Sequence, residues 1–420
     1  MINTTNRLGP DLSLCKNKRE KMMNRYVWIA LVCFFTGFNT PAFCQSWDDI
    51  VKNASGQTIY FNAWGGSQPI NDYIKWASDQ VKKDYGVQVN HVKVTDISEV
   101  VSRILVEKSA NRHTKGSVDL MWINGENFKA MKENRLLFGP FSHLLPNYAL
   151  VDTENKENLL FDFTVPVDHM ESPWGMAQLV FMYDTRQVAA PPESMKELLD
   201  FARSNPGRFT YPAIPEFHGT TFIKQALIEL IDDPDALNRP VAESDFEAVT
   251  RPLWQFLDQL QPYLWRKGTT YPAGASQMLN LLNDTEIFIS LSFNPNSASN
   301  AIENGELPDT VRTYVHSGGT IGNAHFLGIP FNSSAKEAAM VFANFLLSPN
   351  AQARKSNPKI WGDPTVLDIN QLTASQKKLF DAVPKGIATL TPEQLGKTLP
   401  EPHSSWVRAL EKEWLRRYSK

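Results

Sequence analysis

The stretch AWGGSQP, Ala63 to Pro69, stands between an apolar run typical of a strand and a run with helical spacing. A phosphate loop would need a lysine and a hydroxyl residue after the glycines, and a dinucleotide fingerprint would need a third glycine. A nucleophile elbow would need a glycine two positions after Ser67, where Pro69 stands. Two interpretations remain. The loop offers backbone N–H groups and a helix N-terminus to a polar or anionic ligand group, or it is only a tight turn.

A second loop of the same kind is expected in the middle of the chain. The sequence EFHGTT, residues 216–221, precedes an expected helix that begins near Phe222. If the second half of the molecule mirrors the first, this loop and the AWGG loop oppose each other across a cleft. His218 is then either a ligand contact or an ordinary loop histidine.

Aromatic and polar side chains at expected strand ends are further candidates. Rings such as those of Trp64 and Trp174 stack on flat or cationic groups for about 0.5 to 2 kcal/mol each, although either ring could equally belong to a core. Glu126, after the third expected strand, is the carboxylate best placed for a cation, with a solvated loop acid as the alternative. Asn294 and Asn323 either contact a ligand or serve only a local role such as helix capping.

Sequence patterns for catalysis or metal binding are missing. The eight histidines are scattered singly, with no HExxH motif. Adjacent acidic pairs such as Asp232 and Asp233 point apart on a helix. No catalytic residue, metal site or cofactor is therefore expected. The residues expected to bind a small molecule are Trp64, Gly65, Gly66, Ser67, Asn124, Glu126, Trp174, His218, Gly219, Thr220, Tyr271, Phe293 and Asn294.

The N-terminal residues 1–44 have the pattern of a secretory signal peptide with a short extension before it. A basic stretch is followed by an apolar run of 13 residues, Tyr26 to Phe38, and a cut is expected near residues 42–45. The run is too short to span a membrane, but a retained anchor is the alternative. All three cysteines lie in this segment, so the mature chain would have no thiol. Lipidation at Cys44 is a further alternative, against which the bulky Phe43 argues.

Length and charge set the class of protein. With 420 residues the chain is long enough for two domains, each with its own core. After the first 44 residues it has 36 basic and 43 acidic residues, a net charge of −7. An acidic chain without runs of like charge is a poor candidate for binding nucleic acid or an anionic membrane.

Strand-like runs alternate with amphipathic helical stretches from about residue 46, which is typical of an α/β protein with largely parallel sheets. Residues 208–212 are one such expected strand. Residues 171–185 are long for one strand and fit a strand that begins in one sheet and ends in another, and residues 317–330 fit a second crossing. This pattern predicts two lobes joined by two strands, with a ligand cleft between them. We expect residues 45–176 with 326–420 to form lobe 1 and residues 177–325 to form lobe 2.

Several longer motifs carry a family resemblance. They are AWGG (63–66), PWGMAQLVFMYD (173–184), PPESMKELLDFA (191–202) and GIPFNSSAKEAAMVFANFLLSPNAQ (328–352). With the leader, they resemble the family 1 extracellular solute-binding proteins, the type II periplasmic receptors of ABC importers. The resemblance is strongest to an uncharacterised group of thiamine-, iron- and putrescine-like receptors. Ferric receptors carry adjacent tyrosines, whereas Tyr263 and Tyr271 stand apart here, which argues against iron.

The resemblance implies the two-lobed type II periplasmic binding protein fold and a function that follows from it. The expected protein is a monomeric periplasmic receptor that captures a small solute in the cleft and delivers it to an ABC importer permease. The solute could be a thiamine-like organic cation, a sugar or a polyamine. A secreted hydrolase that uses the same cleft is the alternative from a different class.

Overall fold

The computed structural model describes residues 46–419, which belong to one compact unit. The expected signal peptide, its cleavage site and the three cysteines lie outside the described residues. Two hydrophobic cores occur in the described part of the chain, one around each of two β-sheets. The fold is therefore the expected α/β arrangement of two lobes.

The sheet of lobe 1 has the strand order β11-β10-β3-β1-β2, with β6 also paired to β10. β1 is parallel to β2 and β3, whereas β10 is antiparallel to β3 and β6. The strands are β1 (Thr58–Trp64), β2 (Gln88–Val94), β3 (Leu120–Ile123), β6 (Glu171–Gln178), β10 (Thr320–Gly328) and β11 (Thr398–Leu399). Because β1 and β3 are parallel, the loops that follow Trp64 and Ile123 lie at the same edge of the sheet.

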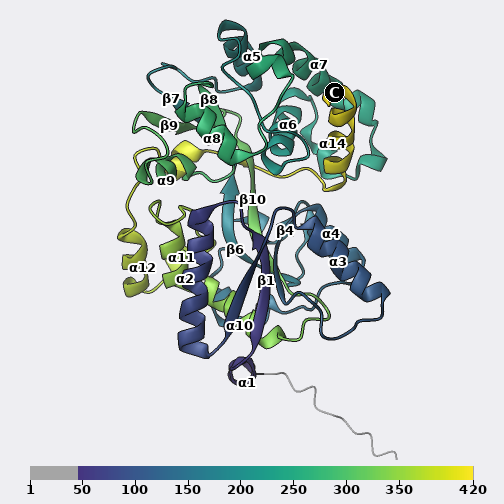
Figure 1. The fold of residues 1–420 in the computed structure, drawn as a ribbon, viewed down its shortest axis with the longest axis vertical. Coiled ribbons are helices and arrows are strands. Elements are labelled where there is room, and N and C mark those ends of the chain that lie inside the picture. Colours follow the sequence, from purple (N-terminus) through teal and green to yellow (C-terminus); the bar gives the residue numbers. More distant parts are fainter. Residues whose placement is uncertain (1–45, 420) are drawn as a thin grey trace, which may run out of the picture. The chain divides into compact units, whose positions relative to one another are not determined.

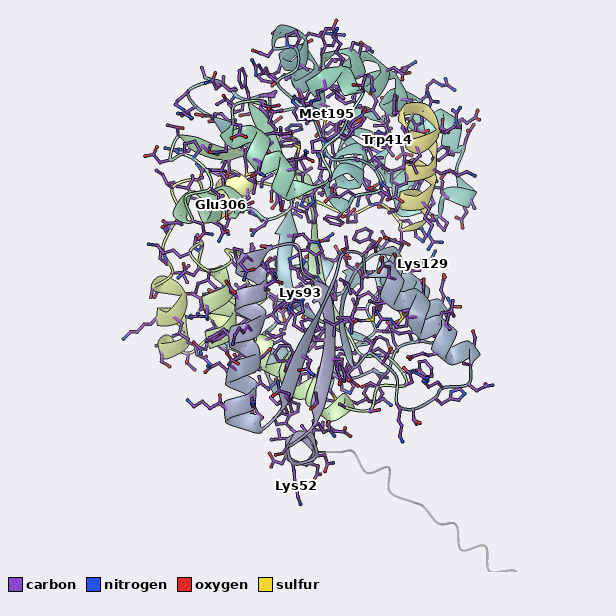
Figure 2. All side chains as sticks on the ribbon, viewed as in Figure 1. Lys52, Lys93, Lys129, Met195, Glu306 and Trp414 are labelled. Atoms are coloured by element: carbon purple, nitrogen blue, oxygen red, sulfur yellow. The ribbon has the colours of Figure 1, made fainter. Side chains whose placement is uncertain are left out.

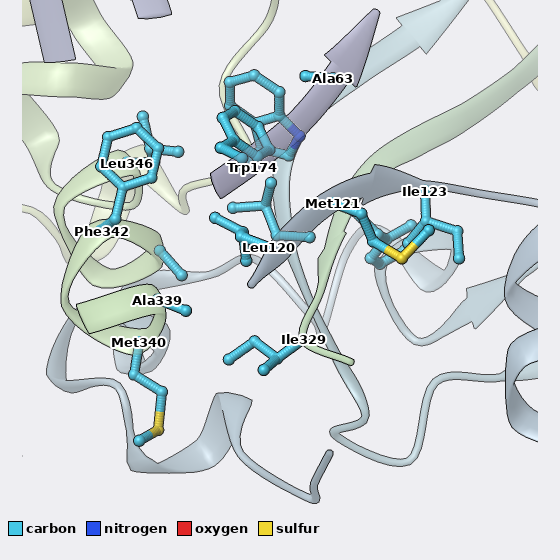
Figure 3. Close-up of a cluster of buried hydrophobic side chains, with 14 of the residues drawn as sticks. Ala63, Leu120, Met121, Ile123, Trp174, Ile329, Ala339, Met340, Phe342 and Leu346 are labelled. Carbon is cyan, nitrogen blue, oxygen red and sulfur yellow. The ribbon is translucent and has the colours of Figure 1, made fainter. Parts of the chain in front are cut away.

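Amphipathic helices cover the sheet of lobe 1. α10 lies within the motif of residues 328–352, and eight of its eleven residues are buried. Figure 3 shows Phe342 and Leu346 of this helix in the same buried cluster as Trp174 and Leu120. The helices of this lobe are α1 (Trp47–Ala54), α2 (Gln68–Tyr85), α3 (Ser98–Ser109), α4 (Glu126–Glu133), α10 (Lys336–Leu346), α11 (Pro349–Ser356) and α12 (Ala374–Asp381). A short hairpin of β4 (Phe161–Asp162) and β5 (Val165–Pro166) precedes β6.

The sheet of lobe 2 is smaller and is not parallel as expected. β7 (Val180–Asp184) lies between β8 (Ile289–Ser292) and β9 (Val311–Tyr314) and is antiparallel to both. The strand expected at residues 208–212 is reduced to a single parallel bridge between Phe209 and Ile289. Helices supply most of this lobe: α5 (Met195–Ser204), α6 (Phe217–Leu230), α7 (Phe246–Leu260), α8 (Ala275–Asn283) and α9 (Ser297–Glu303).

Two extended segments cross between the lobes, as expected from the sequence. One runs from β6 into β7 through Leu179, whose N–H donates to the carbonyl of Ile321 on β10 (2.8 Å). The other is β10 itself, and Figure 1 shows β6 and β10 together between the two groups of helices. Backbone pairing thus continues along the crossing.

The C-terminal residues differ from their expected place. Trp406, Leu410 and Trp414 of α14 (Ser405–Tyr418) are buried in the core of lobe 2, where Trp414 Nε1 donates to the hydroxyl of Tyr211 (3.1 Å). The chain therefore returns to lobe 2 after α12, through α13 (Pro392–Leu395) and β11. The assignment of all of residues 326–420 to lobe 1 is therefore wrong for α14. Two tryptophans and one leucine, at helical spacing on this helix, pack in the lobe 2 core.

Candidate functional site

Both glycines of the AWGG loop lie close to neighbouring side chains. A Cβ on Gly65 would lie 2.6 Å from Cβ of Lys93, and a Cβ on Gly66 would lie 2.4 Å from ring atom Cζ2 of Trp64. The Gly65 N–H donates to the carbonyl of Val94 (3.1 Å), so this N–H is used within the sheet. Helix α2 begins directly after Ser67, which gives no side-chain cap to the helix. A Cβ at either position would therefore meet a neighbouring side chain unless that side chain moves. Figure 2 labels Lys93 near the end of β2.

The sequence EFHGTT does not form the expected loop. It is the first turn of α6, and its N-cap is Glu216. The Glu216 carboxylate accepts from the N–H groups of His218 (2.7 Å) and Gly219 (3.1 Å), and Nδ1 of His218 lies 2.8 Å from Glu216 Oε1. A Cβ on Gly219 would lie 2.3 Å from the carbonyl oxygen of Pro212. The glycine allows the helix to approach that backbone, and the expected free N–H groups are already satisfied.

The next turn of α6 carries a buried lysine. Lys224 is 1% exposed, and its Nζ lies 2.6 Å from Oε2 of Glu401, which is 4% exposed. Oε1 of the same glutamate accepts from Nδ2 of Asn323 on β10 (3.0 Å). Four residues before Lys224, on the same face of the helix, Thr220 donates from Oγ1 to Oε1 of Glu411 on α14 (2.9 Å). This face of α6 therefore meets a crossing strand and the C-terminal segment.

Lobe 1 reaches the same lysine through the β4–β5 hairpin. The ring centroid of Phe163 lies 4.7 Å from Lys224 Nζ, and that of Phe217, on lobe 2, lies 5.8 Å away. These distances fit cation–π contacts. Asp162, the residue before Phe163, accepts from the N–H of Gly125 with both carboxylate oxygens (2.8 Å each). Contacts of Lys224 therefore come from both lobes.

We define the carboxylate cluster as Glu126, Asp162, Glu401 and Glu411, around Lys224. Burial raises the pKa of Asp162 well above its usual range and also raises the pKa of Glu126. Burial raises the pKa of Glu411 to about 7, although the hydrogen bond from Thr220 opposes the shift. The other acids of the cluster add to these shifts, whereas Lys224 opposes them. The cluster is therefore a place where ionised carboxylates are costly, mainly because they are buried.

The other residues predicted to bind solute lie in different surroundings. Trp174 is fully buried in the core of lobe 1, with its ring centroid 5.0 Å from that of Trp122. Tyr271 is partly buried beside the core of lobe 2 and donates its hydroxyl to Oε1 of Gln261 (2.7 Å). Phe293 is 5% exposed and packs edge-to-face on Phe217 with centroids 5.1 Å apart. In this structure these three rings serve packing.

Asn294 and two neighbouring asparagines attach α9 of lobe 2 to the segment after α11. Nδ2 of Asn294 donates to the carbonyl of Trp361 (3.2 Å) and Nδ2 of Asn300 to that of Pro358 (2.6 Å). Asn296 donates in the same way to the carbonyl of Gly362. The side-chain amides of this region are therefore occupied by backbone carbonyls. Asn124, half-buried, precedes Gly125 at the edge where Glu126 begins α4.

A cavity of about 350 Å³ lies between α2, the segment after α11, and the end of α9. It touches both lobes, since Tyr73 and Arg354 belong to lobe 1 and Asn304 and Glu306 to lobe 2. Its lining is Gln68, Pro69, Asp72, Tyr73, Asn304, Glu306, Arg354, Lys359 and Ile360. None of the residues predicted to bind solute lines this cavity.

Two of the residues predicted to bind solute lie at the carboxylate cluster: Glu126 belongs to it, and Thr220 donates to Glu411. The other residues there were not predicted from the sequence. The missed residues are Asp162, Phe163, Lys224, Glu401 and Glu411. One signal was available in the sequence FIKQALI, because Lys224 is a single cation inside an apolar helical run. Its partner Glu401 comes 177 residues later, in a Pro-rich segment without periodicity.

Between residues 46 and 419, no group of three or more His, Cys, Asp or Glu side chains is arranged to hold a metal ion. In the same range, no helix is both long and apolar enough to cross a membrane.

Comparison with known proteins gives a consistent result. Residues 76–401 match the family described as bacterial extracellular solute-binding protein. Protein YnjB of Escherichia coli (strain K12) is 44% identical over 381 residues, which cover 91% of this chain and 96% of that protein.

Solved structures with the same fold are more distant in sequence. The Tp0655 (TpPotD) lipoprotein of Treponema pallidum has a TM-score of 0.63 at 13% identity, covering 86% of this chain and 98% of that chain. A putative spermidine/putrescine ABC transporter protein from Listeria monocytogenes has a TM-score of 0.62 at 14% identity, with the same coverage. The periplasmic binding protein AfuA from Actinobacillus pleuropneumoniae, with fructose-6-phosphate bound, has a TM-score of 0.60 at 14% identity, covering 87% and 99%.

Proposed function

The chain belongs to the bacterial extracellular solute-binding proteins, and from that premise we propose that it is a periplasmic receptor for an ABC importer. Its signal peptide is removed on export, and the mature protein acts as a monomer. It captures a small solute between its lobes and presents the closed form to the importer's permease. The family does not support the hydrolase alternative.

One observation carries the proposal: the side chains around Lys224 come from both lobes. Phe163 belongs to lobe 1, Lys224 and Thr220 to lobe 2, and Asn323 to a crossing strand. A solute held in such a place contacts both lobes only when they are together. Its binding energy therefore favours the closed state, which is the population shift that a transport receptor needs.

The site between the lobes is proposed to include Glu126 and Thr220 from the residues predicted by sequence, with Trp64, Gly66 and Ser67 at the neighbouring edge of the lobe 1 sheet. Trp64 is 37% exposed, so part of its ring is available to a ligand. The candidate solutes remain an organic cation, a polyamine and a sugar. The solved relatives are described with polyamine or sugar phosphate names, which supports a small polar solute in general.

The proposal is tested with the exported protein purified from periplasm. Native mass spectrometry should detect a small molecule that copurifies, and thermal shift over vitamins, sugars, polyamines and ferric complexes should find a compound that raises Tm. A matched variant pair, Thr220→Val in the site and Thr269→Val on the lobe 2 surface, should separate binding from general stability. Chemical turnover of the hit, or no stabilisation by any compound of the panel, would contradict a receptor function.

A further inference from the structure

The carboxylate cluster has more acids than its one buried cation can balance. Glu126 and Glu401 act on Asp162, Glu401 acts on Glu126, and Glu126 acts on Glu411, while Lys224 acts on Asp162, Glu126 and Glu411. Only Glu401 has a direct ion pair with Lys224, at 2.6 Å. Arg408, which is exposed on α14, is the other cation that acts on Glu126. A second positive charge beside Glu126 or Glu411 would favour the ionised form of that carboxyl group and would be attracted by it.

A separate observation indicates a missing hydrogen-bond donor in the same place. Asn323 lies on the crossing strand β10 and is 5% exposed. Its Nδ2 is bonded to Glu401, which fixes the amide plane beside the cluster. Its Oδ1 is buried and has no hydrogen-bond partner among the described residues. A buried carbonyl oxygen without a donor costs about 1 to 3 kcal/mol, so an N–H from a ligand would remove that cost.

The aromatic side chains complete the surroundings of a cation. Phe163 and Phe217 already place their rings within reach of Lys224 Nζ, at 4.7 and 5.8 Å. Phe217 is 38% exposed, so its ring is also accessible from outside the core. Aromatic faces and carboxylates together suit an alkylammonium group, through cation–π contacts and charge-assisted hydrogen bonds.

We propose that the carboxylate cluster is the subsite for a protonated amine of the solute, held by Glu126 and Glu411, with an N–H donated to Oδ1 of Asn323. This inference rests on the proposed receptor function and names its substrate class: an organic cation that carries N–H donors. Lys224 stays paired with Glu401 and in contact with the ring of Phe163. Neutral sugars and anionic solutes lack the charge that the site requires.

Binding of the cation should be coupled to proton release. Glu411 has a pKa of about 7 because of burial, and Glu126 adds to that shift while Lys224 and the Thr220 hydroxyl oppose it. Asp96 also acts on Glu411, and Glu401 and Arg408 act on Glu126. An ammonium group binds best when Glu411 is ionised, so affinity should rise as pH increases from about 6 to about 8.

A set of four-carbon probes tests charge and N–H donation separately. The probes are 1,4-diaminobutane, its fully N-methylated bis-quaternary counterpart, 1,4-butanediol and succinate, measured by calorimetry and thermal shift on the mature protein. The diamine should bind most tightly, the bis-quaternary ion about ten-fold more weakly because it has no N–H, and the diol and succinate not measurably. Diol or succinate binding as tight as the diamine would overturn the inference.

Matched variants locate the subsite. Glu126→Gln and Glu411→Gln should each weaken diamine binding by about ten-fold or more, and Glu411→Gln should remove the rise of affinity with pH. Glu133→Gln, at the exposed end of the same helix α4, should change it by less than about two-fold. Unchanged affinity in both cluster variants would overturn the inference.

The two proposals fail in different ways. A sugar or an anion that raises Tm in the wider screen, while no amine does, leaves the receptor function in place and overturns the amine subsite. A panel in which no compound of any charge raises Tm contradicts both. Circular dichroism of Glu126→Gln and Glu411→Gln confirms that each variant is folded, and either variant alone is sufficient for the test.

Discussion

The ammonium of Lys224 lies 2.6 Å from Oε2 of Glu401, and both side chains are at most 4% exposed. The two residues are 177 positions apart, so this ion pair ties α6 to the C-terminal segment. Phe163 of lobe 1 lies over the same ammonium at 4.7 Å. The pair is thus part of the lobe 2 core and of the contact between lobes at once.

Replacing Lys224 with methionine should destabilise the protein by about 3 to 5 kcal/mol, because Glu401 is left buried without its partner. The double variant Lys224→Met/Glu401→Gln should recover part of the loss, since no charge is then unpaired. Urea unfolding measures both. Lys75→Met, which removes an exposed pair with Asp79, is the control and should have a much smaller effect. If Lys224→Met and Lys75→Met lost the same amount of stability, the buried ion pair would contribute no more than the exposed one.

Glu411 should make the protein less stable as pH rises. Its pKa is about 7 in the folded protein and 4.5 in its ordinary state, so the native state favours the protonated form. The stabilisation is complete below about pH 4.5 and is lost as pH rises through about 7. Between about pH 5 and pH 8, Glu411→Gln should therefore lose less stability than the native sequence in urea unfolding. Comparing the two proteins removes the contribution of other groups, such as His91. Parallel pH profiles would contradict the raised pKa.

Trp174 and Trp64 should respond differently to the same substitution. Trp174→Ala removes a fully buried ring from the lobe 1 core and should cost about 3 to 5 kcal/mol of stability. Trp64 is 37% exposed, so Trp64→Ala should cost less than about 2 kcal/mol. If Trp64 contacts the solute, its variant should also weaken the affinity of the strongest hit. A larger loss of stability for Trp64→Ala than for Trp174→Ala would contradict their placement.

The sequence predicted the fold well where local patterns carry it. The sequence predicts alternating strands and helices and a strand at residues 171–185 that crosses between sheets, and both features occur, with α10 among the helices. Two of the four family motifs, at residues 173–184 and 328–352, contain these elements. The lobe 2 sheet was harder to predict, because the strand expected at residues 208–212 forms only one bridge and the antiparallel order depends on distant strands.

The candidate site was predicted less well, because most of its partners are distant in sequence. Lys224 meets Glu401 and Phe163 only after the chain has folded, and no spacing rule connects these positions. The sequence predicts His218 and Gly219 in a loop like AWGG, ahead of a helix that begins near Phe222. The carboxylate of Glu216 instead caps their N–H groups and begins the helix there. Glycine inside that first turn is explained only by the carbonyl of Pro212 beside it.

The glycine pair of the AWGG loop makes a graded prediction. In Gly65→Ala the new Cβ would lie 2.6 Å from Cβ of Lys93, an atom fixed to the backbone of β2, so overpacking should cost about 1 to 3 kcal/mol. In Gly66→Ala the clash is with the partly exposed ring of Trp64, which can turn away, so the cost should be smaller, about 1 kcal/mol. Gly318→Ala, with no atom within 4 Å of the new Cβ, should be neutral or slightly stabilising. Urea unfolding of the three variants measures the order. A Gly65→Ala protein as stable as Gly318→Ala would show that the glycine at position 65 is not required by packing.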